Sequence, residues 1–588
     1  MPNLKPFLLS LGCLGIGLLL GRADVRMPAL FGDHMVLQQG TTLAVWGWAS
    51  PDEKVTVSFG AQSVSAVAGS DGTWRVDLAA VPYSDKGAVL TVAGKNTLIF
   101  NDVLVGDDWV ASGQSNMEYG INGKKDYVAD VDKATDPLLR LFFVPKTSAL
   151  TPQTDLVLDD PATPYAGATT QPTTKPPRDP YAGTWLLCTP ENLRKINGQG
   201  FATVAYFFAR AIRAQYGHPV GMIESSWGGT RAEVWTSLAG LQKDPPFANY
   251  LKIRQNNVDK FSSLEPTYLQ RKDAHDIALE QWNQGDGKAF NTVHDAWKLA
   301  VKQATATGQP LPPEPKPATP RPSDVHTPDG GPDGPANLYN AMIAPLMPFA
   351  IKGVIWYQGE FNSGFDSGRE YATLFPRMIN SWRDAWGRGN FPFIFVQLPN
   401  VNTIDAQPSV EGGGWRWVRE GQLKALSLPN TAMAITIDIG EPELLHPPDK
   451  LDVGLRLALA ARQLAYGEKI VASGPLYDSM TIEGNKIRVK FQDVGSGLTT
   501  GVSPYHPNGK VPVLSPDLHG FGIAGSDHVF VWANAVIDGD TVVVSSDKVA
   551  EPLSVRYDFS NSPTGNLYNK DGLPASPFRT DNWDERDK

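Results

Sequence analysis

Cysteine is almost absent from this sequence. Only Cys13 and Cys188 occur among its 588 residues, and Cys13 lies in the apolar N-terminal run. A disulfide framework is therefore excluded for a chain that has lost this run. A chain of this length can bury enough apolar surface without such cross-links. Cys188 follows Trp185, Leu186 and Leu187, a setting that predicts a buried, inert thiol rather than a nucleophile.

Long apolar runs and basic stretches are also missing. The one extended apolar run, residues 7–20, is shorter than the about 20 residues of a membrane-spanning helix, so no transmembrane segment is expected. The run follows Lys5 and precedes Gly21-Arg22-Ala23, the order of a secretory signal. We therefore expect removal of residues 1–23 and a secreted or periplasmic protein. The net charge of -10 and the lack of a basic stripe argue against nucleic acid as a partner.

The remaining chain is long enough for several domains. Residues 24–102 contain short alternating strands with glycine and proline between them, which predicts an N-terminal β-sandwich. Residues 103–238 and 336–470 alternate strands with helices, which predicts an α/β domain with a doubly wound parallel sheet. Residues 239–335 are expected to be an insertion, helical at first and then irregular. Residues 471–588 return to the strand pattern and predict a C-terminal β domain.

One stretch organises the central part of the chain. The apolar run that begins at Val103 predicts a buried parallel strand, and it leads into Gly113-Gln114-Ser115-Asn116. A sharp turn there would place Ser115 beyond the carboxyl end of the strand, where open α/β sheets carry their reactive groups. Serine becomes a nucleophile when a histidine takes its proton. The alternative is that Ser115 caps a helix that begins at Asn116 or Met117.

Other predicted strand ends carry groups that would complete such a site. Gly228 and Gly229 follow one strand, and Gln358, Gly359 and Asn362 follow another. Backbone N–H groups of glycines and side-chain amides can stabilise an oxyanion, because they can approach a substrate closely. His446 is the only histidine that follows a buried strand and opens a helix, so it is the natural general base.

Several motifs in this order resemble the sialate O-acetylesterase family, which comprises carbohydrate esterases of the SGNH hydrolase superfamily. The resemblance extends over nearly the full length. The motifs are Asp33-His34-Met35-Val36-Leu37-Gln38, Gly113-Gln114-Ser115-Asn116-Met117, Ser226-Trp227-Gly228-Gly229-Thr230, Leu338-Tyr339-Asn340-Ala341-Met342-Ile343, Trp356-Tyr357-Gln358-Gly359-Glu360, His446-Pro447 and Leu573-Pro574-Ala575-Ser576-Pro577-Phe578-Arg579-Thr580.

The resemblance implies an SGNH-hydrolase-like fold and a specific chemistry. It implies Ser115 as the nucleophile, His446 as the base, a covalent acetyl-enzyme intermediate, and neither a metal nor another cofactor. The residues expected to bind the oxyanion or the substrate are Gln114, Gly228, Gly229, Gln358, Gly359 and Asn362.

Two positions depart from the family pattern. Relatives often read Asp-Ile-His-Pro at the last catalytic motif, whereas this chain has Glu443 three residues before the histidine. We expect Glu443 to orient the imidazole, with Asp438, Glu441 or a serine–histidine dyad as alternatives. Phe361 stands where a small residue is usual, and a ring there would narrow the acyl pocket or the sugar site. The insertion is longer than usual and is expected to form one wall of the cleft.

The resulting prediction is a secreted serine esterase that removes O-acetyl groups from acetylated sugars. O-acetylated sialic acid is the first substrate that we expect. One alternative is an esterase acting on acetylated xylan or another polysaccharide. Another is a carbohydrate-binding protein whose hydrolase core has lost activity. The presence of Ser115, His446, Gly228 and Gln358 favours an active enzyme.

Overall fold

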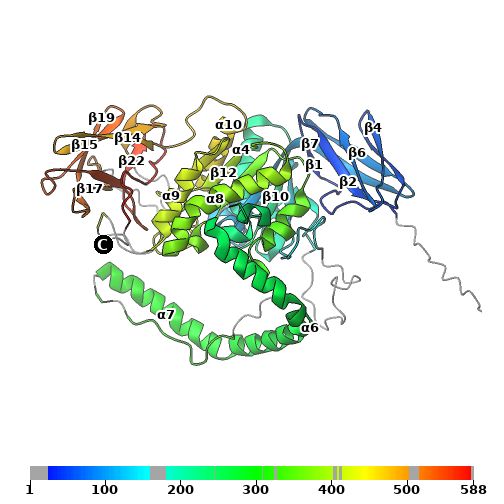
Figure 1. Cartoon of the computed structure of the whole chain (residues 1–588), viewed down its shortest axis with the longest axis horizontal. Coiled ribbons are helices and arrows are strands. Elements are labelled where there is room, and N and C mark those ends of the chain that lie inside the picture. Colours follow the sequence, from blue (N-terminus) through cyan, green and yellow to red (C-terminus); the bar gives the residue numbers. More distant parts are fainter. Residues whose placement is uncertain are drawn as a thin grey trace, which may run out of the picture.

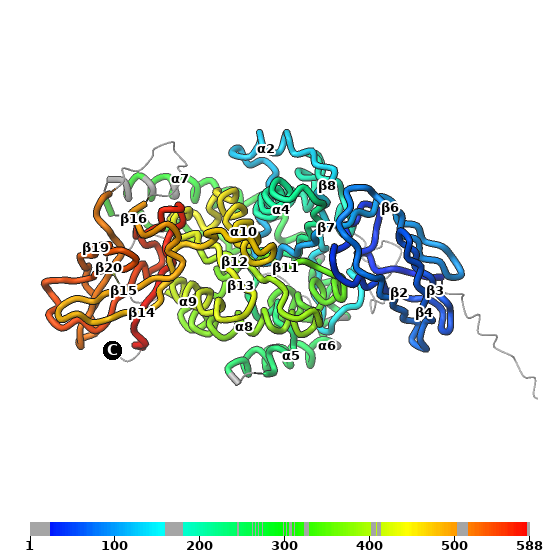
Figure 2. Tube along the Cα trace, turned by 90° about the horizontal axis from the view of Figure 1, so that it is seen from above, coloured from blue at the N-terminus to red at the C-terminus, as the bar shows by residue number. Residues whose placement is uncertain are grey.

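The computed structural model describes residues 24–158, 180–243, 245–307, 309–310, 312–322, 328–401, 407–408, 413–501 and 515–584. The predicted signal segment, residues 1–23, lies outside these ranges. Figures 1 and 2 show three parts along the long axis, with a β region at each end and an α/β region between them. None of the helices in the described ranges has the length and apolar character needed to cross a bilayer.

The N-terminal part consists of β-strands, as predicted. Strand β2 (Leu43–Trp48) pairs with β5 (Thr73–Leu78), while β3 (Lys54–Phe59) lies between β4 (Gln62–Val67) and β6 (Ser84–Ala93). Side chains along β5 alternate between exposed and buried, which is the period of two of a strand with one face on a core. The β character of this region is confirmed, and its packing as a sandwich stays a prediction.

A single long strand joins this part to the central region. Strand β7 (Thr97–Gly113) pairs antiparallel with β6 through its first half and parallel with β1 (Val36–Gln38) further on. Its burial alternates up to residue 102 and is continuous from Val103 onward. The expected domain boundary between residues 102 and 103 therefore coincides with a change of environment, but it falls inside one uninterrupted strand.

The central sheet is mostly parallel and places β7 in its middle. Its order across the sheet is β13 (Thr431–Ala434), β12 (Phe393–Val396), β11 (Gly353–Tyr357), β7, β10 (Val220–Ser226), β8 (Asp136–Phe143) and β9 (Trp185–Cys188). All neighbouring pairs are parallel except β8 with β9. From β7 the chain adds strands first on one side and then on the other. The predicted mixed α/β fold with parallel strands is confirmed, and the SGNH-like winding stays a prediction.

Helices cover both faces of this sheet, as buried parallel strands require. Figure 2 shows α4 (Thr203–Tyr216) and α10 (Leu451–Leu464) on one face, and α8 (Phe365–Trp386) and α9 (Trp415–Ala425) on the other. Helix α4 ends at Gly217, whose φ of 71° provides the left-handed cap that glycine favours.

The edge strand β9 carries the single cysteine of the described residues. Cys188 is free and buried, and burial raises the pKa of its thiol to about 12. A thiol with so high a pKa is almost entirely protonated near neutral pH, and it is the thiolate that reacts. The predicted burial of this cysteine is confirmed, and its inertness stays a prediction.

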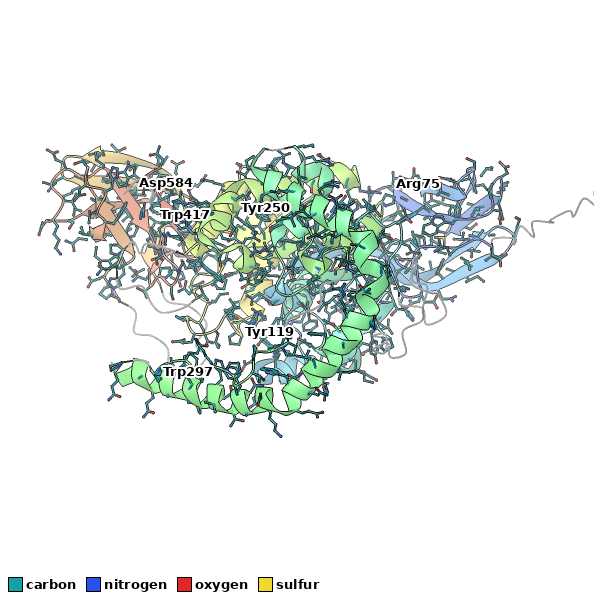
Figure 3. All side chains as sticks on the ribbon, turned by 60° about the horizontal axis from the view of Figure 1, so that its bottom comes forward. Arg75, Tyr119, Tyr250, Trp297, Trp417 and Asp584 are labelled. Carbon is teal, nitrogen blue, oxygen red and sulfur yellow. The ribbon has the colours of Figure 1, made fainter. Side chains whose placement is uncertain are left out.

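The insertion forms a helical arm. Helices α6 (Ala248–Gln284) and α7 (Asp286–Thr307) leave the central region and run below it in Figure 1. The irregular return segment lies along this arm, because Trp297 Nε1 donates to the carbonyl of Pro312 at 3.0 Å. Figure 3 labels Trp297 on α7. The first part of this region is thus helical in the structure, while its bounds as an insertion and its role as a wall of the cleft stay predictions.

The C-terminal part has its own apolar core and two four-stranded sheets. The larger strands are β14 (Leu476–Glu483), β15 (Lys486–Gln492), β19 (Asn534–Asp538) and β20 (Thr541–Ser545). Trp417 of α9 is 2% exposed, with the guanidinium groups of Arg369 and Arg579 at 3.9 and 4.6 Å from its ring. Since Arg579 belongs to the C-terminal part, this stack joins that part to the central helices (Figure 3).

Candidate active site

Ser115 lies where the long central strand turns into a short helix. Strand β7 ends at Gly113, and α1 (Ser115–Glu118) begins two residues later. A Cβ atom at Gly113 would lie 2.1 Å from the carbonyl oxygen of Tyr357, and its φ is 137°, so only glycine allows this turn. Gln114 occupies the capping position, and Ser115 is the first helical residue. The alternative role of Ser115 as a helix cap is therefore not observed.

His446 contacts this serine, as its position in the sequence predicted. Its Nε2 lies 2.8 Å from Ser115 Oγ, although the two residues are 331 positions apart. The pKa of His446 is lowered, first because the surrounding protein removes part of its hydration and then because Lys450 and Lys124 lie nearby. Glu118 opposes this shift. A histidine with a lowered pKa is neutral, and able to accept a proton, over a wider pH range.

The acid expected beside His446 is not in contact with it. Glu443 is exposed, and within the described residues it makes neither a hydrogen bond nor an ion pair. It lies in a turn in which the N–H of Leu444 donates to the carbonyl of Glu441 at 2.9 Å. Asp438, an alternative, is held by Arg456 Nη1 and Nη2 at 2.5 and 2.7 Å. Within the described part of the chain, Ser115 and His446 therefore form a pair with no carboxylate hydrogen-bonded to the imidazole.

Gly228 lies directly beside the serine, but its N–H is already engaged. A Cβ atom at Gly228 would lie 3.2 Å from Ser115 Cβ. Its N–H donates to Glu118 Oε2 at 2.5 Å, and Lys146 forms an ion pair with the same carboxylate. Gly228 thus lies beside Ser115 with a carboxylate as the present acceptor of its N–H, and its role as an oxyanion donor stays a prediction. Gly229 has a φ of 70° and supplies the exposed turn that follows.

Gln358 and Asn362 come together behind this turn in a buried network. Gln358 Nε2 donates to Asn362 Oδ1 at 2.7 Å and to the carbonyl of Thr230 at 3.1 Å. Asn362 Nδ2 donates to Glu233 Oε2 at 3.0 Å. These bonds tie together the turns that follow β10 and β11. Both amides are therefore close to the predicted site, and their present bonds are within the protein.

Gln114 and Gly359 hold the segment that carries Phe361. Gln114 Oε1 accepts hydrogen bonds from the N–H groups of Phe361 at 3.1 Å and of Gly359 at 3.5 Å. The ring of Phe361 is 46% exposed, and the Arg231 guanidinium lies 5.1 Å from its centre. The bulky residue noted in the sequence therefore forms an aromatic and cationic rim beside the serine turn.

Sequence reasoning missed three polar residues of this site. Glu118 follows Ser115 by three positions, so both face the same side of the helix, and this spacing was the available signal. Asn116 and Lys450 are buried, and Lys450 Nζ donates to Asn116 Oδ1 at 2.5 Å. Within the described residues, no group of three or more His, Cys, Asp or Glu side chains is arranged to hold a metal ion.

Comparisons with known proteins give a consistent set of relatives. The family model described as "Carbohydrate esterase, sialic acid-specific acetylesterase" matches residues 330–463. The sialate O-acetylesterase of Rattus norvegicus is 29% identical over 485 residues, which cover 77% of this chain and 76% of the relative. The enzyme of Homo sapiens is 27% identical, over 78% of this chain and 75% of its own. The structure of a carbohydrate acetylesterase from Xanthomonas citri has 34% identity and a TM-score of 0.70, over 95% of this chain and 100% of that chain.

The class of the protein follows from these relatives and from the contact between Ser115 and His446. It is a carboxylic ester hydrolase. The relative of known structure is aligned over its entire chain at 34% identity. The chain belongs to the sialate O-acetylesterase family of carbohydrate esterases.

Proposed function

We propose that this protein is an exported enzyme that removes O-acetyl groups from acetylated sugars through an acetyl-serine intermediate on Ser115. The observation that carries the proposal is the 2.8 Å distance between Ser115 Oγ and His446 Nε2 at the carboxyl end of the central strand. The names of the relatives, sialate O-acetylesterase and carbohydrate acetylesterase, support the substrate class.

The reaction proceeds in two halves. Ser115 Oγ attacks the carbonyl carbon of the acetyl ester while His446 Nε2 takes the hydroxyl proton. The tetrahedral intermediate collapses, the bond to the sugar oxygen breaks, and His446 returns the proton to that oxygen. Water then attacks the acetyl-serine carbonyl as His446 takes its proton. The second intermediate releases acetate, and Ser115 Oγ recovers its proton.

The developing negative charge needs donors close to Ser115. We assign the N–H of Gly228 to this role, because it is adjacent to the nucleophile and belongs to the turn after β10. The ester oxygen must replace the Glu118 carboxylate as its acceptor, and Lys146 can keep the displaced carboxylate neutralised. Gln358, Gly359, Asn362 and Gln114 are assigned to holding the two turns in place around the oxyanion and the substrate.

The rim beside the serine suits a sugar. Exposed aromatic rings supply flat apolar contacts for a ligand, and an arginine supplies donors for carboxylate or hydroxyl oxygens. Phe361 and Arg231 form such a pair next to the nucleophile turn. The exposed cation favours an acidic sugar over a neutral one, and we therefore place acetylated sialic acid before acetylated xylan.

The test compares acetate release from O-acetylated sialic acid and from acetylated xylan by the purified protein, with the Ser115→Ala variant as the blank. We expect release from the sialic acid ester that the variant lacks. Release from xylan alone would shift the substrate to plant polysaccharides. Failure to hydrolyse either substrate, together with 4-nitrophenyl acetate, would contradict the enzymatic function and favour a carbohydrate-binding role.

A further inference from the structure

We propose that Asn116 positions the general base in place of a triad acid, by holding both ends of the segment that carries His446 against the nucleophile turn. This inference rests on the proposed roles of Ser115 and His446. It addresses a problem that the geometry raises, because His446 Nδ1 meets no carboxylate within the described residues. In a serine–histidine–aspartate triad the acid fixes the orientation of the imidazole. Another part of the protein must do so here.

The side chain of Asn116 reaches three partners, each of them far away in the sequence. Its Nδ2 donates to the carbonyl of Leu445 at 3.0 Å and to Glu360 Oε1 at 2.6 Å. Its Oδ1 accepts from Lys450 Nζ at 2.5 Å. Leu445 directly precedes His446, and Lys450 follows it by four residues. The Asn116 amide, which is adjacent to the nucleophile, is therefore hydrogen-bonded to the segment that carries His446 both before and after the imidazole.

These partners allow only one orientation of the amide. Both Nδ2 hydrogens point at acceptors, and Oδ1 faces an ammonium group. A reversed amide would set its oxygen against the Leu445 carbonyl and the Glu360 carboxylate, and its NH₂ group against Lys450. The Asn116 side chain is fully buried, so water cannot compensate for lost bonds. We call these three hydrogen bonds, from Asn116 to Leu445, Glu360 and Lys450, the clamp. They hold the Asn116 side chain in a single orientation.

A second anchor acts on the same segment. The hydroxyl of Tyr127 donates to the carbonyl of Pro448 at 2.5 Å and accepts from the N–H of Lys450 at 2.7 Å. Together with the bond from Asn116 to the Leu445 carbonyl, these contacts fix the backbone before and after His446. The 2.8 Å contact of Nε2 with Ser115 Oγ then sets the rotation of the imidazole. Such supporting contacts are what hold catalytic groups within a few tenths of an ångström of their working geometry.

The network is a costly one to bury, which argues against a merely structural role. Lys450 is 0% exposed, and burial lowers the pKa of its amine to about 7, a shift that the charges of Glu360 and Asp449 oppose. Glu360 Oε2 is buried and has no hydrogen-bond partner among the described residues. Apolar residues of similar size are often as stabilising as a buried charged pair. Titratable groups with shifted pKa values gather at functional sites.

The first experiment is the Asn116→Asp variant, which keeps the shape of the side chain and loses the Nδ2 donor. We expect kcat for 4-nitrophenyl acetate to fall by roughly 10–100-fold, the usual effect of losing a residue that orients a catalytic ligand, with KM nearly unchanged. The matched control is Asn569→Asp. Asn569 is equally buried, its Nδ2 donates to the carbonyl of Ser473 at 3.0 Å, and it lies in the C-terminal part. This control should keep its kcat.

A second pair of variants separates positioning from charge. Lys450 and Lys124 both lower the pKa of His446, and Glu118 raises it. Lysine-to-methionine substitution at either position should therefore move the acid limb of kcat/KM to higher pH. Only Lys450→Met should also lower the plateau of kcat, because only Lys450 contacts Asn116. If Asn116→Asp fails to fold, this comparison still decides the question.

Two results would overturn the clamp. One is an Asn116→Asp variant that folds and keeps kcat within threefold of the native enzyme. The other is a plateau value of kcat in Lys450→Met that equals the plateau value in Lys124→Met. Both outcomes are compatible with covalent labelling of Ser115 by a fluorophosphonate, which tests the proposed function separately. Failure of that labelling in the native protein would instead remove the proposed roles of Ser115 and His446.

Discussion

At the scale of single residues, the proposed mechanism makes Ser115 and His446 a catalytic unit, because it transfers the proton across the 2.8 Å contact between Oγ and Nε2. We predict that Ser115→Ala and His446→Ala each lower kcat on the order of 10⁶-fold, and that the double variant is little worse than either. Steady-state kinetics of the three variants measure this. Losses that multiply in the double variant would show that the two side chains act independently.

The pH dependence of the enzyme follows from the surroundings of His446. As the proposed base, His446 must be neutral to accept a proton, and its pKa is lowered from the ordinary value of 6.5, so the acid limb of kcat/KM should lie below pH 6.5. Glu118 favours the protonated ring. Loss of this charge in Glu118→Gln should therefore move the acid limb of kcat/KM to still lower pH.

A pH–rate profile of this variant beside the native enzyme checks the direction of the shift. The control is Glu443→Gln, which should leave both rate and profile unchanged, because this carboxylate has no hydrogen bond or ion pair within the described residues. A limb that moves upward in Glu118→Gln contradicts the electrostatic account. A large loss in Glu443→Gln would restore this residue as the acid of a triad.

At the scale of elements, local sequence signals were enough to find the strand ends but not the contacts between them. The apolar run before Gly113, and the glycines that follow β10 and β11, predicted where Ser115, Gly228 and Gln358 lie. Parallel strands bring their carboxyl ends to one edge of the sheet, so these turns had to meet. His446 could be predicted because a histidine between a buried strand and a helix lies at this same edge.

The remaining features of the site depend on distances in space that no local pattern reveals. Glu118 and Gly228 are 110 positions apart, and Asn116 and Lys450 are 334 apart. Their hydrogen bonds arise from how the turns pack after the sheet has formed. The expected contact between Glu443 and His446 is missing for a different reason, because here a local pattern was present but misleading. Its spacing from His446 fits a helical turn, but the segment folds as a turn closed by Glu441 and Leu444, and the carboxylate faces solvent.

At the scale of the whole molecule, the two β regions attach to the central part in different ways. The N-terminal region shares the continuous strand β7 with the central sheet. The C-terminal region has a separate core and is joined through side chains, including the stack of Arg369, Trp417 and Arg579. An ion pair between Arg369 and Asp584, at 3.3 Å, adds to this junction (Figure 3).

We predict that Trp417→Ala lowers the free energy of unfolding by about 3–5 kcal/mol, the usual cost of truncating a buried tryptophan. The folded fraction should keep its kcat, because the Trp417 ring packs against Arg369, Arg579 and Phe559, none of which is assigned a role in the reaction. Thermal unfolding followed by circular dichroism, together with kinetics at low temperature, measures both effects. Trp297→Ala on the helical arm is the matched control and should cost much less, since Trp297 is only partly buried. Equal costs would contradict the prediction that the stack contributes more to stability than the helical arm does.

The central claim is that Ser115 is the nucleophile that carries the acyl group, and covalent labelling tests it most directly. The native protein is incubated with a fluorophosphonate, and the modified residue is located by peptide mass spectrometry as esterase activity is followed. We predict a single phosphonyl group on Ser115, loss of activity in proportion to labelling, and no labelling of Ser115→Ala. Inactivation with the label on another residue, or full esterase activity in the labelled protein, would contradict the account.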